Sequence, residues 1–216
     1  TNRDVEFLDY RSYNGRSVYC RSLAFLLCKS VRDLYPDFRV ILRRPISKGY
    51  FCTVDKPDGS SVTAEETEAV RAHMRELVAA DLPFRRHEVQ VAEAIRIFKK
   101  LGYEDKVKLL RTCGDVYITY YSLQDTADYF YDALVPSTGL LKVWELTPYR
   151  GGMLLRVPDR HAPEELAPFR EQPKTFEVFK ETMHWNRIMG LANVGDVNAA
   201  CQQGQAPDLI QVAEAL

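Results

Sequence analysis

The sequence predicts an α+β fold with a helical extension at its C-terminal end. Between residues 21 and 36, apolar side chains recur at the spacing of one helix face, and a second such pattern covers residues 63–83. Short runs of β-branched and aromatic residues separate and follow these two segments. From Ala162 onward the pattern is that of helices alone. We therefore expect an α+β body up to about residue 160, followed by helices.

The first helix is expected to end at Pro36, because proline removes a backbone donor and disfavours helix at the residue before it. Its apolar face consists of Leu23, Leu26, Leu27, Val31 and Leu34. Thr63 and Glu66 have the spacing of a capping box, which marks the start of the second helix. The apolar face of that helix consists of Val70, Met74, Leu77 and Val78.

The remaining elements follow from the same patterns. Strands are expected at residues 38–44, 49–54, 86–91, 107–112, 116–121, 140–146 and 153–157. Further helices are expected at residues 92–101, from Pro163, from Thr175 and after Pro207. In the helix from Thr175, Phe176, Phe179, Met183 and Ile188 are expected to face inward.

Composition excludes several classes of protein. The 29 basic and 30 acidic residues give a net charge of −1, which argues against a broad non-specific nucleic-acid surface but allows a local basic patch. The five cysteines are odd in number and include no CxxC pair, which favours reduced thiols and a cytoplasmic location over a disulfide framework. No apolar run approaches the roughly 20 residues that a membrane span needs, so we expect no membrane association.

Several polar and aromatic groups are candidates for function, each with a structural alternative. The segment YITYYSLQDTADYFYDA, which contains Tyr121, could stack a base or ribose, or could supply cross-strand packing. Asp125 and Asp128 could share acid–base chemistry, or could serve turns and caps. The four histidines are scattered and lack HxxxH or HxH spacing, so they predict no zinc site.

The segment GLANVGD at residues 190–196 has the opening spacing of a phosphate-binding P-loop. The lysine and the serine or threonine that should follow are replaced by Asp196 and Val197. Because a carboxylate there would repel phosphate, we interpret Asp196 as the N-cap of a short helix and expect no ATP site in these residues.

Five segments together resemble the editing domain of threonyl- and alanyl-tRNA synthetases. RSLAFLLCKSVRDLYP at residues 21–36 resembles that family's HxxxHLL…LYP helix, and ISKGYF at 46–51 resembles its I-x-x-G-F-Y strand. Residues 63–83 resemble its long helix with a Leu-Pro exit, and KVKLL at 106–110 resembles a segment with a substrate-side lysine. DYFYDALVPSTG at 128–139 resembles the family's D-L-C-x-G-P-H-V-P-x-T-G.

The resemblance implies a zinc-type site whose four ligands have been lost. The family's histidines and cysteine fall on Arg21, Phe25, Phe130 and Leu134. None of these side chains can bind a divalent metal. We therefore expect a degenerate metal site refilled as core, with no metal and no catalytic residue.

The same resemblance leaves polar residues that could still bind a ligand. Lys106 and Asp128 match a pocket lysine and an aspartate near the family's substrate. Arg21 could pair with Asp128, bind a phosphate or carboxylate, or form an internal salt bridge. The candidate ligand-binding residues are Arg21, Lys106, Asp128 and Tyr121.

Nearly the whole chain also resembles the N-terminal region of bacterial uridine kinase-like proteins. This resemblance rests on RDVEFLDY, on VPSTG and on the C-terminal segments MGLANVGDVN and DLIQVAEAL. It implies three parts: a remnant strand of a TGS-like domain at 1–10, an editing-domain-like domain at 11–160, and a helical extension at 161–216. It also implies that the chain is a fragment, and that a kinase domain using ATP and magnesium follows it.

Four functions remain open. The chain could be a non-catalytic region that senses a small ligand or an RNA end, or that docks on its own kinase domain. It could instead be a metal-independent editing hydrolase using Lys106 and Asp128, or an RNA-binding module. It could finally act as a scaffold or oligomerise through its C-terminal helices. No cofactor is expected within these residues.

Overall fold

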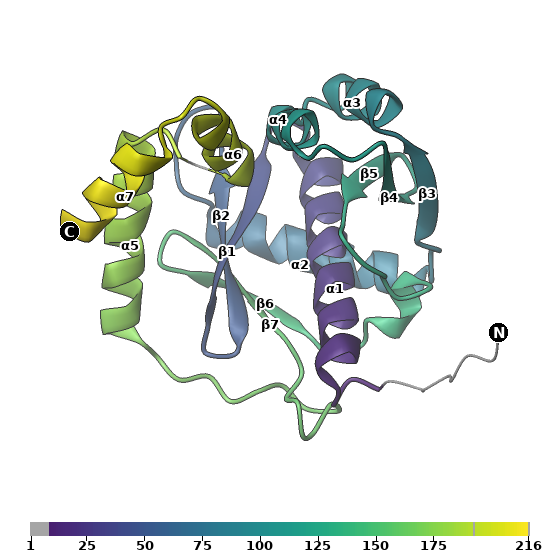
Figure 1. Ribbon diagram of the computed structural model, residues 1–216. Coiled ribbons are helices and arrows are strands. Elements are labelled where there is room, and N and C mark those ends of the chain that lie inside the picture. Colours follow the sequence, from purple (N-terminus) through teal and green to yellow (C-terminus); the bar gives the residue numbers. More distant parts are fainter. Residues whose placement is uncertain (1–8, 192, 216) are drawn as a thin grey trace. The chain divides into compact units, whose positions relative to one another are not determined.

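The computed structural model describes residues 9–191 and 193–215, which form seven α-helices, one short 3-10 helix and seven strands (Figure 1). The strands form one four-stranded and one three-stranded sheet. The fold is therefore α+β with helices packed on its sheets, as the sequence predicts. The predicted TGS-like strand falls mostly on residues 1–8, outside the described residues. Two compact units are present: Thr1–Arg85, Ser122–Thr126 and Phe130–Pro173 in the first, and Arg86–Tyr121, Ala127–Tyr129 and Lys174–Leu216 in the second.

The first unit is built on an antiparallel sheet with strand order β1-β2-β7-β6. Its strands are β1 (Arg39–Ile46), β2 (Gly49–Asp55), β6 (Glu145–Tyr149) and β7 (Gly152–Arg156). The residues of β7 from Gly152 to Leu155 are all buried, so this strand is covered on both faces. A Cβ atom at Gly152 would lie 2.4 Å from the Cys52 carbonyl oxygen, so only glycine allows this close approach of β2 and β7.

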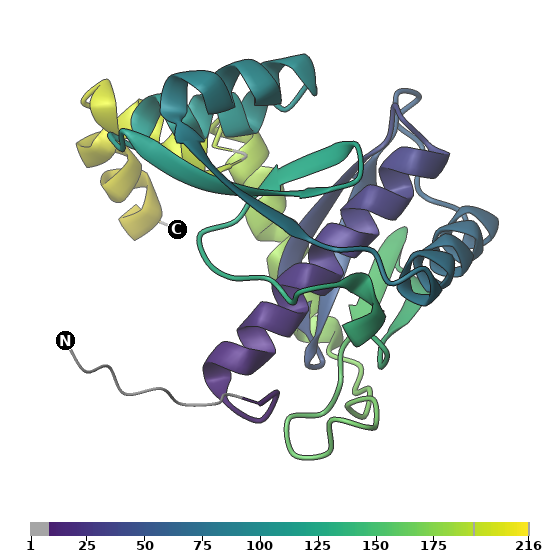
Figure 2. The same cartoon turned by 90° about the vertical axis from the view of Figure 1, so that its right-hand side faces the viewer.

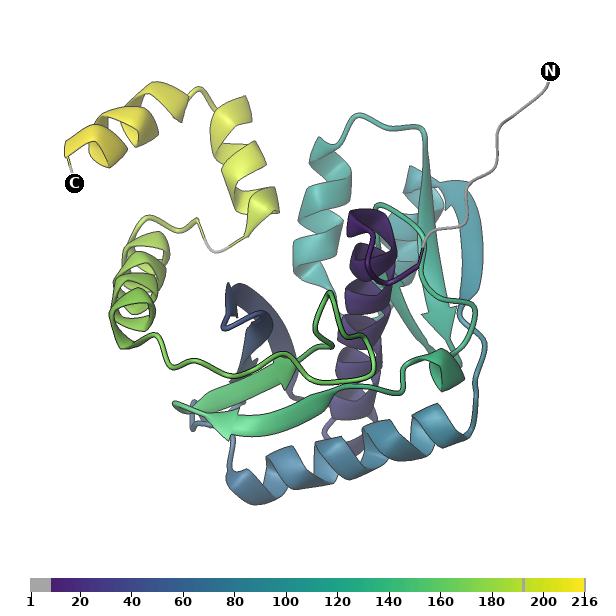
Figure 3. The same ribbon diagram turned by 90° about the horizontal axis from the view of Figure 1, so that it is seen from below.

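Two helices pack in this unit. Helix α1 (Tyr13–Leu34) begins earlier than predicted, because the Ser12 hydroxyl accepts a hydrogen bond from the Gly15 amide and caps it. Helix α2 (Ala64–Ala79) begins with the capping box of Thr63 and Glu66, which confirms that prediction. It contacts both α1 and β6, as Figure 3 shows.

One predicted strand of the first unit is wrong in part. Residues 140–146 were expected to be extended, but they include the end of a 3-10 helix, η1 (Thr138–Leu140), and only the start of β6. The Thr138 hydroxyl donates to the Leu77 carbonyl and accepts from the Leu82 amide, and these bonds hold η1 on the end of α2.

The second unit contains two helices and most of the three-stranded sheet of β3 (Arg85–Gln90), β4 (Tyr117–Leu123) and β5 (Thr126–Tyr129). Helices α3 (Val91–Lys100) and α4 (Glu104–Thr112) lie side by side over this sheet (Figure 2). The predicted strand at 107–112 is therefore wrong. The core beneath the helices consists of Ala94, Phe98, Val107, Leu110 and Ile118.

The C-terminal helices differ from prediction at three points. Residues 163–165 do not open a helix, and the first one is α5 (Pro173–Ile188). Phe176 and Phe179 are buried as expected, but Ile188 is 60% exposed and does not face inward. Asn193, not Asp196, caps α6 (Val194–Gln202). The last helix is α7 (Ala206–Ala215), as expected after Pro207. Within the described part of the chain, no helix is long and apolar enough to cross a membrane.

Candidate functional site

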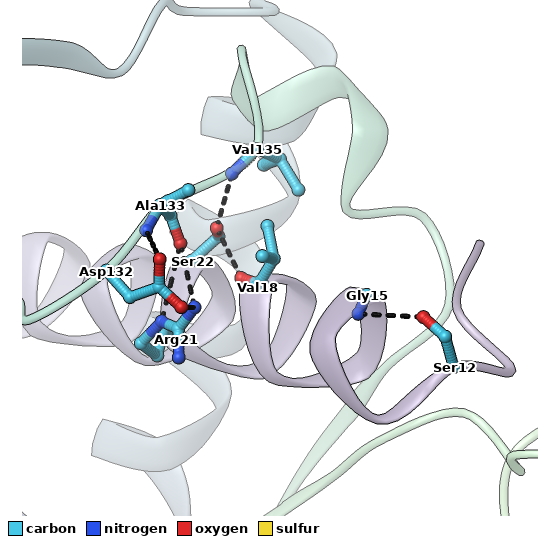
Figure 4. Close-up of polar contacts among 8 residues, drawn as sticks. All are labelled: Ser12, Gly15, Val18, Arg21, Ser22, Asp132, Ala133 and Val135. Carbon is cyan, nitrogen blue, oxygen red and sulfur yellow. Dashed lines mark hydrogen bonds and ion pairs between the residues drawn. The ribbon is translucent and has the colours of Figure 1, made fainter. Parts of the chain in front are cut away.

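Arg21 forms an internal salt bridge with the segment that follows β5. Its guanidinium donates to the Asp132 carboxylate at 3.0 Å and to the Ala133 carbonyl at 3.1 and 3.3 Å (Figure 4). The arginine side chain is 26% exposed. Of the three interpretations that the sequence left open, the structure matches the internal salt bridge, with Asp132 and not Asp128 as the partner.

Ser22 provides a second link between the same two segments. Its hydroxyl accepts a hydrogen bond from the Val135 amide and donates to the Val18 carbonyl, each at 2.8 Å (Figure 4). Ser22 is fully buried, so the loss of either bond would leave a polar group unsatisfied in the interior. Sequence reasoning missed Ser22, although a serine among the apolar residues of a helix is a usable signal.

Beside these polar links, the implied metal position is filled by apolar side chains. Phe25 is 0% exposed, and its ring lies 5.4 Å from that of Phe130 and 5.7 Å from that of Phe84. Leu134 is also buried. These distances are those of favourable aromatic pairs, so the site is packed as core.

The residues present do not fit a metal ion. Phenyl, leucine and guanidinium groups offer no lone pair to a divalent cation. Across residues 9–191 and 193–215, no three His, Cys, Asp or Glu side chains are grouped in a way that could hold a metal.

Lys106 and Asp128 pair with each other in the second unit. The Lys106 ammonium lies 2.8 Å from the Asp128 carboxylate, and the side chains are 27% and 14% exposed. The same carboxylate accepts a hydrogen bond from the Tyr129 amide at 2.7 Å. Lys106 comes from α4 and Asp128 from β5, so the pair fastens this helix to the sheet.

The tyrosine-rich segment is only partly available for stacking. Tyr121 is 6% exposed, which leaves little of its ring for a ligand. Tyr120 stacks on His87 with ring centroids 4.7 Å apart, and burial raises the pKa of its hydroxyl. Tyr117 and Tyr131 are exposed. The segment therefore combines buried rings, which pack within the fold, with two exposed aromatic rings.

A polar network that sequence reasoning missed surrounds Lys29 on α1. The Lys29 ammonium contacts Asp33 at 2.5 Å and Asp125 at 2.7 Å, and the lysine side chain is only 3% exposed. Asp33 also contacts Nε2 of His73 at 3.0 Å, and Nδ1 of His73 contacts Glu76 at 3.1 Å. The network joins α1, α2 and the β4–β5 turn. Asp125 pairs with Lys29 and Asp128 pairs with Lys106, so the two carboxylates do not share a cationic partner.

Comparison with known proteins identifies threonine–tRNA ligases as relatives. The chain is 31% identical to that of Geobacter sp. (strain M21) over 149 residues, 68% of this chain and 23% of the relative. It is 33% identical to that of Nitrosococcus oceani over 142 residues, 65% of this chain and 22% of the relative. It is 32% identical to that of Acidithiobacillus ferrooxidans over 150 residues, 68% of this chain and 23% of the relative. No protein-family profile matches the chain.

These relatives agree with the resemblance to threonyl-tRNA synthetases and with an editing-domain-like fold. They do not bear on the resemblance to uridine kinase-like proteins. The chain spans less than a quarter of the length of these curated relatives. Over about two thirds of its own length, it is homologous to part of a threonine–tRNA ligase.

Proposed function

We propose that this chain is a non-catalytic region that senses a ligand or docks a neighbouring domain, built on a tRNA-editing fold that has lost its metal. The observation that carries the proposal is the packing of Phe25 against Phe84 and Phe130 where the resemblance places metal ligands. A lost metal forfeits several kcal/mol of transition-state stabilisation, by order of magnitude, and the Arg21–Asp132 ion pair cannot act as a Lewis acid in its place.

The ionic and hydrogen-bonding contacts of Arg21 and Ser22 support a scaffolding role for this position. A metal bound by α1 and the segment after β5 would join them. Here Arg21 and Ser22 join them instead, through Asp132, Ala133 and Val135. The fold can thus persist without its metal.

The wider setting of the proposal rests on sequence resemblance alone. We propose that the parent protein is a cytoplasmic, ATP-dependent uridine or nucleoside kinase, whose kinase domain would bind ATP and magnesium and contact this region. Phosphoryl transfer from ATP to uridine by the full-length protein tests this part. Absence of transfer to any common nucleoside would remove it and leave the proposal for the editing fold standing.

The loss of the metal site is tested by zinc analysis of the purified chain and by a variant that restores the four ligands. The purified chain should hold no stoichiometric zinc and should not deacylate mischarged tRNA. The quadruple variant Arg21→His, Phe25→His, Phe130→Cys, Leu134→His should gain zinc, because it restores the family's ligand types at positions that the structure brings together. The double variant Phe25→His, Phe130→Cys supplies too few ligands and is the matched control. Stoichiometric zinc in the unmodified chain would refute the proposal.

A second candidate function is a metal-independent aminoacyl-tRNA editing hydrolase. The observation that favours it is the Lys106–Asp128 pair, which matches two polar residues of the family and is intact at 2.8 Å. Such an enzyme would rely on a ribose hydroxyl of its substrate to assist the attack of water on the aminoacyl ester, which releases the amino acid and leaves the ribose hydroxyl free. Turnover on mischarged tRNA that Asp128→Ala abolishes, and that Asp132→Ala leaves in place, would favour this function over the first.

A further inference from the structure

A cavity of about 460 Å³ lies in the first unit, apart from the site described above. One wall is the turn between β1 and β2, with Pro45, Ser47 and Lys48. The other is the extended segment before α5, with Pro168, Arg170 and Gln172. The volume falls within the range of small-molecule sites, which is roughly 300–1,000 Å³.

The two walls are bonded to each other. The Arg170 amide donates to the Ser47 hydroxyl at 2.5 Å, and the Ser47 amide donates to the Gln172 side-chain carbonyl at 3.4 Å. In the extended segment, every second residue lines the cavity, as the alternation of an extended chain requires. These bonds hold the two walls together, and each wall contributes one cationic residue to the lining, Lys48 from one and Arg170 from the other.

The positive charge of the lining residues favours an anionic ligand. Lys48 and Arg170 are cationic, and none of its lining residues is acidic. Asp159, outside the lining, accepts from the Lys48 ammonium at 3.1 Å and so neutralises part of this charge. Among the described residues, none forms an ion pair with the Arg170 guanidinium. That guanidinium is therefore available for a planar, bidentate contact with an anion.

We propose that this cavity binds a small organic anion through a carboxylate or phosphate group held by Arg170 and Lys48. The hydroxyl of Ser47 and the amide of Gln172 would orient the anion, and Pro45 and Pro168 would contact its apolar part. The inference does not depend on the proposed function, because it uses none of the residues of the degenerate metal site.

Titration of the ¹⁵N-labelled chain with inorganic phosphate, and separately with acetate, tests the proposal and distinguishes the two anions. Chloride at equal ionic strength corrects for screening. We expect saturable shifts of the Ser47 and Arg170 amides with at least one of the two anions. Arg170→Gln should weaken binding about tenfold, the effect of losing one charged hydrogen bond.

Two further variants make the result decisive. Asp159→Asn should tighten binding, because it frees Lys48 and keeps an acceptor for the His161 amide that Asp159 now binds. A variant that only damaged the fold would not do this. Arg85→Gln, an exposed arginine at the start of β3, should leave affinity unchanged. Shifts that do not saturate with either anion, or that respond equally to chloride or to Arg85→Gln, would overturn the proposal.

Discussion

The ammonium nitrogen of Lys29 lies 2.7 Å from a carboxylate oxygen of Asp125, a residue 96 positions later in the chain. The lysine side chain is 3% exposed and that of Asp125 is 84% exposed, so the buried ammonium forms an ion pair with an exposed carboxylate. The hydrogen bond from Lys29 is also the main reason that the pKa of Asp125 is lowered. Through this contact, the β4–β5 turn is held on α1.

Removing a carboxylate partner of Lys29 should lower the free energy of unfolding more than removing the lysine charge itself. Asp33→Asn leaves a buried ammonium with only an exposed partner and should lower the free energy of unfolding by about 2 kcal/mol, less than for a fully buried pair. Lys29→Met removes the buried charge and keeps its volume, so its cost should be smaller. Urea unfolding measures both, with the exposed Asp37→Asn as control. A larger loss for Lys29→Met would contradict this account.

Stability should fall as pH rises above about 6.5, because His73 then loses its proton. Burial lowers the pKa of His73, but hydrogen bonds to Asp33 and Glu76 outweigh it and hold the pKa above its usual 6.5. The protonated ring therefore stabilises the fold fully below about pH 6.5, and this contribution is lost as pH rises through the folded-state pKa.

Thermal unfolding of the chain and of His73→Gln, measured at a series of pH values from about 5.5 upward, tests whether the stabilisation by His73 falls as pH rises. The two melting temperatures should converge with rising pH. A difference that grows with pH would show that the neutral ring makes the stabilising contact.

Truncating Phe25 should be among the most damaging changes in the first unit. Phe25→Ala deletes a fully buried ring between Phe84 and Phe130 and should cost about 3–5 kcal/mol. Phe130→Ala should cost less, because that side chain is half-buried. Chemical denaturation of the two variants gives the ranking, and equal losses would mean that the ring of Phe25 is not the centre of the cluster.

Helix α6 should loosen when a methyl group is added at Gly195. A Cβ atom there would lie 3.0 Å from the Leu109 amide nitrogen and 3.0 Å from Cβ of Lys108, so α4 and α6 could not keep their spacing. Gly195→Ala should destabilise the second unit by about 1–2 kcal/mol despite the better helix propensity of alanine.

Hydrogen exchange of the α6 amides measures this loosening, and Gln202→Ala on an exposed position of the same helix is the control. Faster exchange in both variants, or in neither, would contradict the close approach at Gly195. The GLANVGD motif is thereby explained by packing: Gly195 permits contact, and Asp196 completes the cap of Asn193 and accepts from Lys108 at 2.6 Å.

The sequence predicts best those helices and strands whose ends are fixed by interactions between residues close together in the chain. The Thr63–Glu66 capping box was predictable because both bonds are formed within one turn. Residues 107–112 were not, because six residues cannot separate a period of 2 from a period of 3.6. In the structure, Val107 and Leu110 both face the core although they are three residues apart, as residues on one face of a helix do, and the acidic Glu104 and Asp105 lie in the first turn of α4.

The candidate site was predictable in its residue types but not in its pairings. Arg21 had an internal salt bridge among its alternatives, yet Asp132 as the partner depends on how the segment after β5 returns to α1. Lys29 could not be expected inside, because lysine is almost never fully buried without paired carboxylates. Its partner Asp125 becomes visible only once distant segments are brought together.

The irregular end of β1 bears on how copies of this chain meet. The strand lies at an edge of its sheet, and its register with β2 shifts between Leu42 and Pro45. Proline offers no amide to an incoming strand, and a bulge bends the exposed edge away from flat pairing. Edge-to-edge pairing of β1 with a strand of a second copy is therefore disfavoured, which protects the sheet against aggregation.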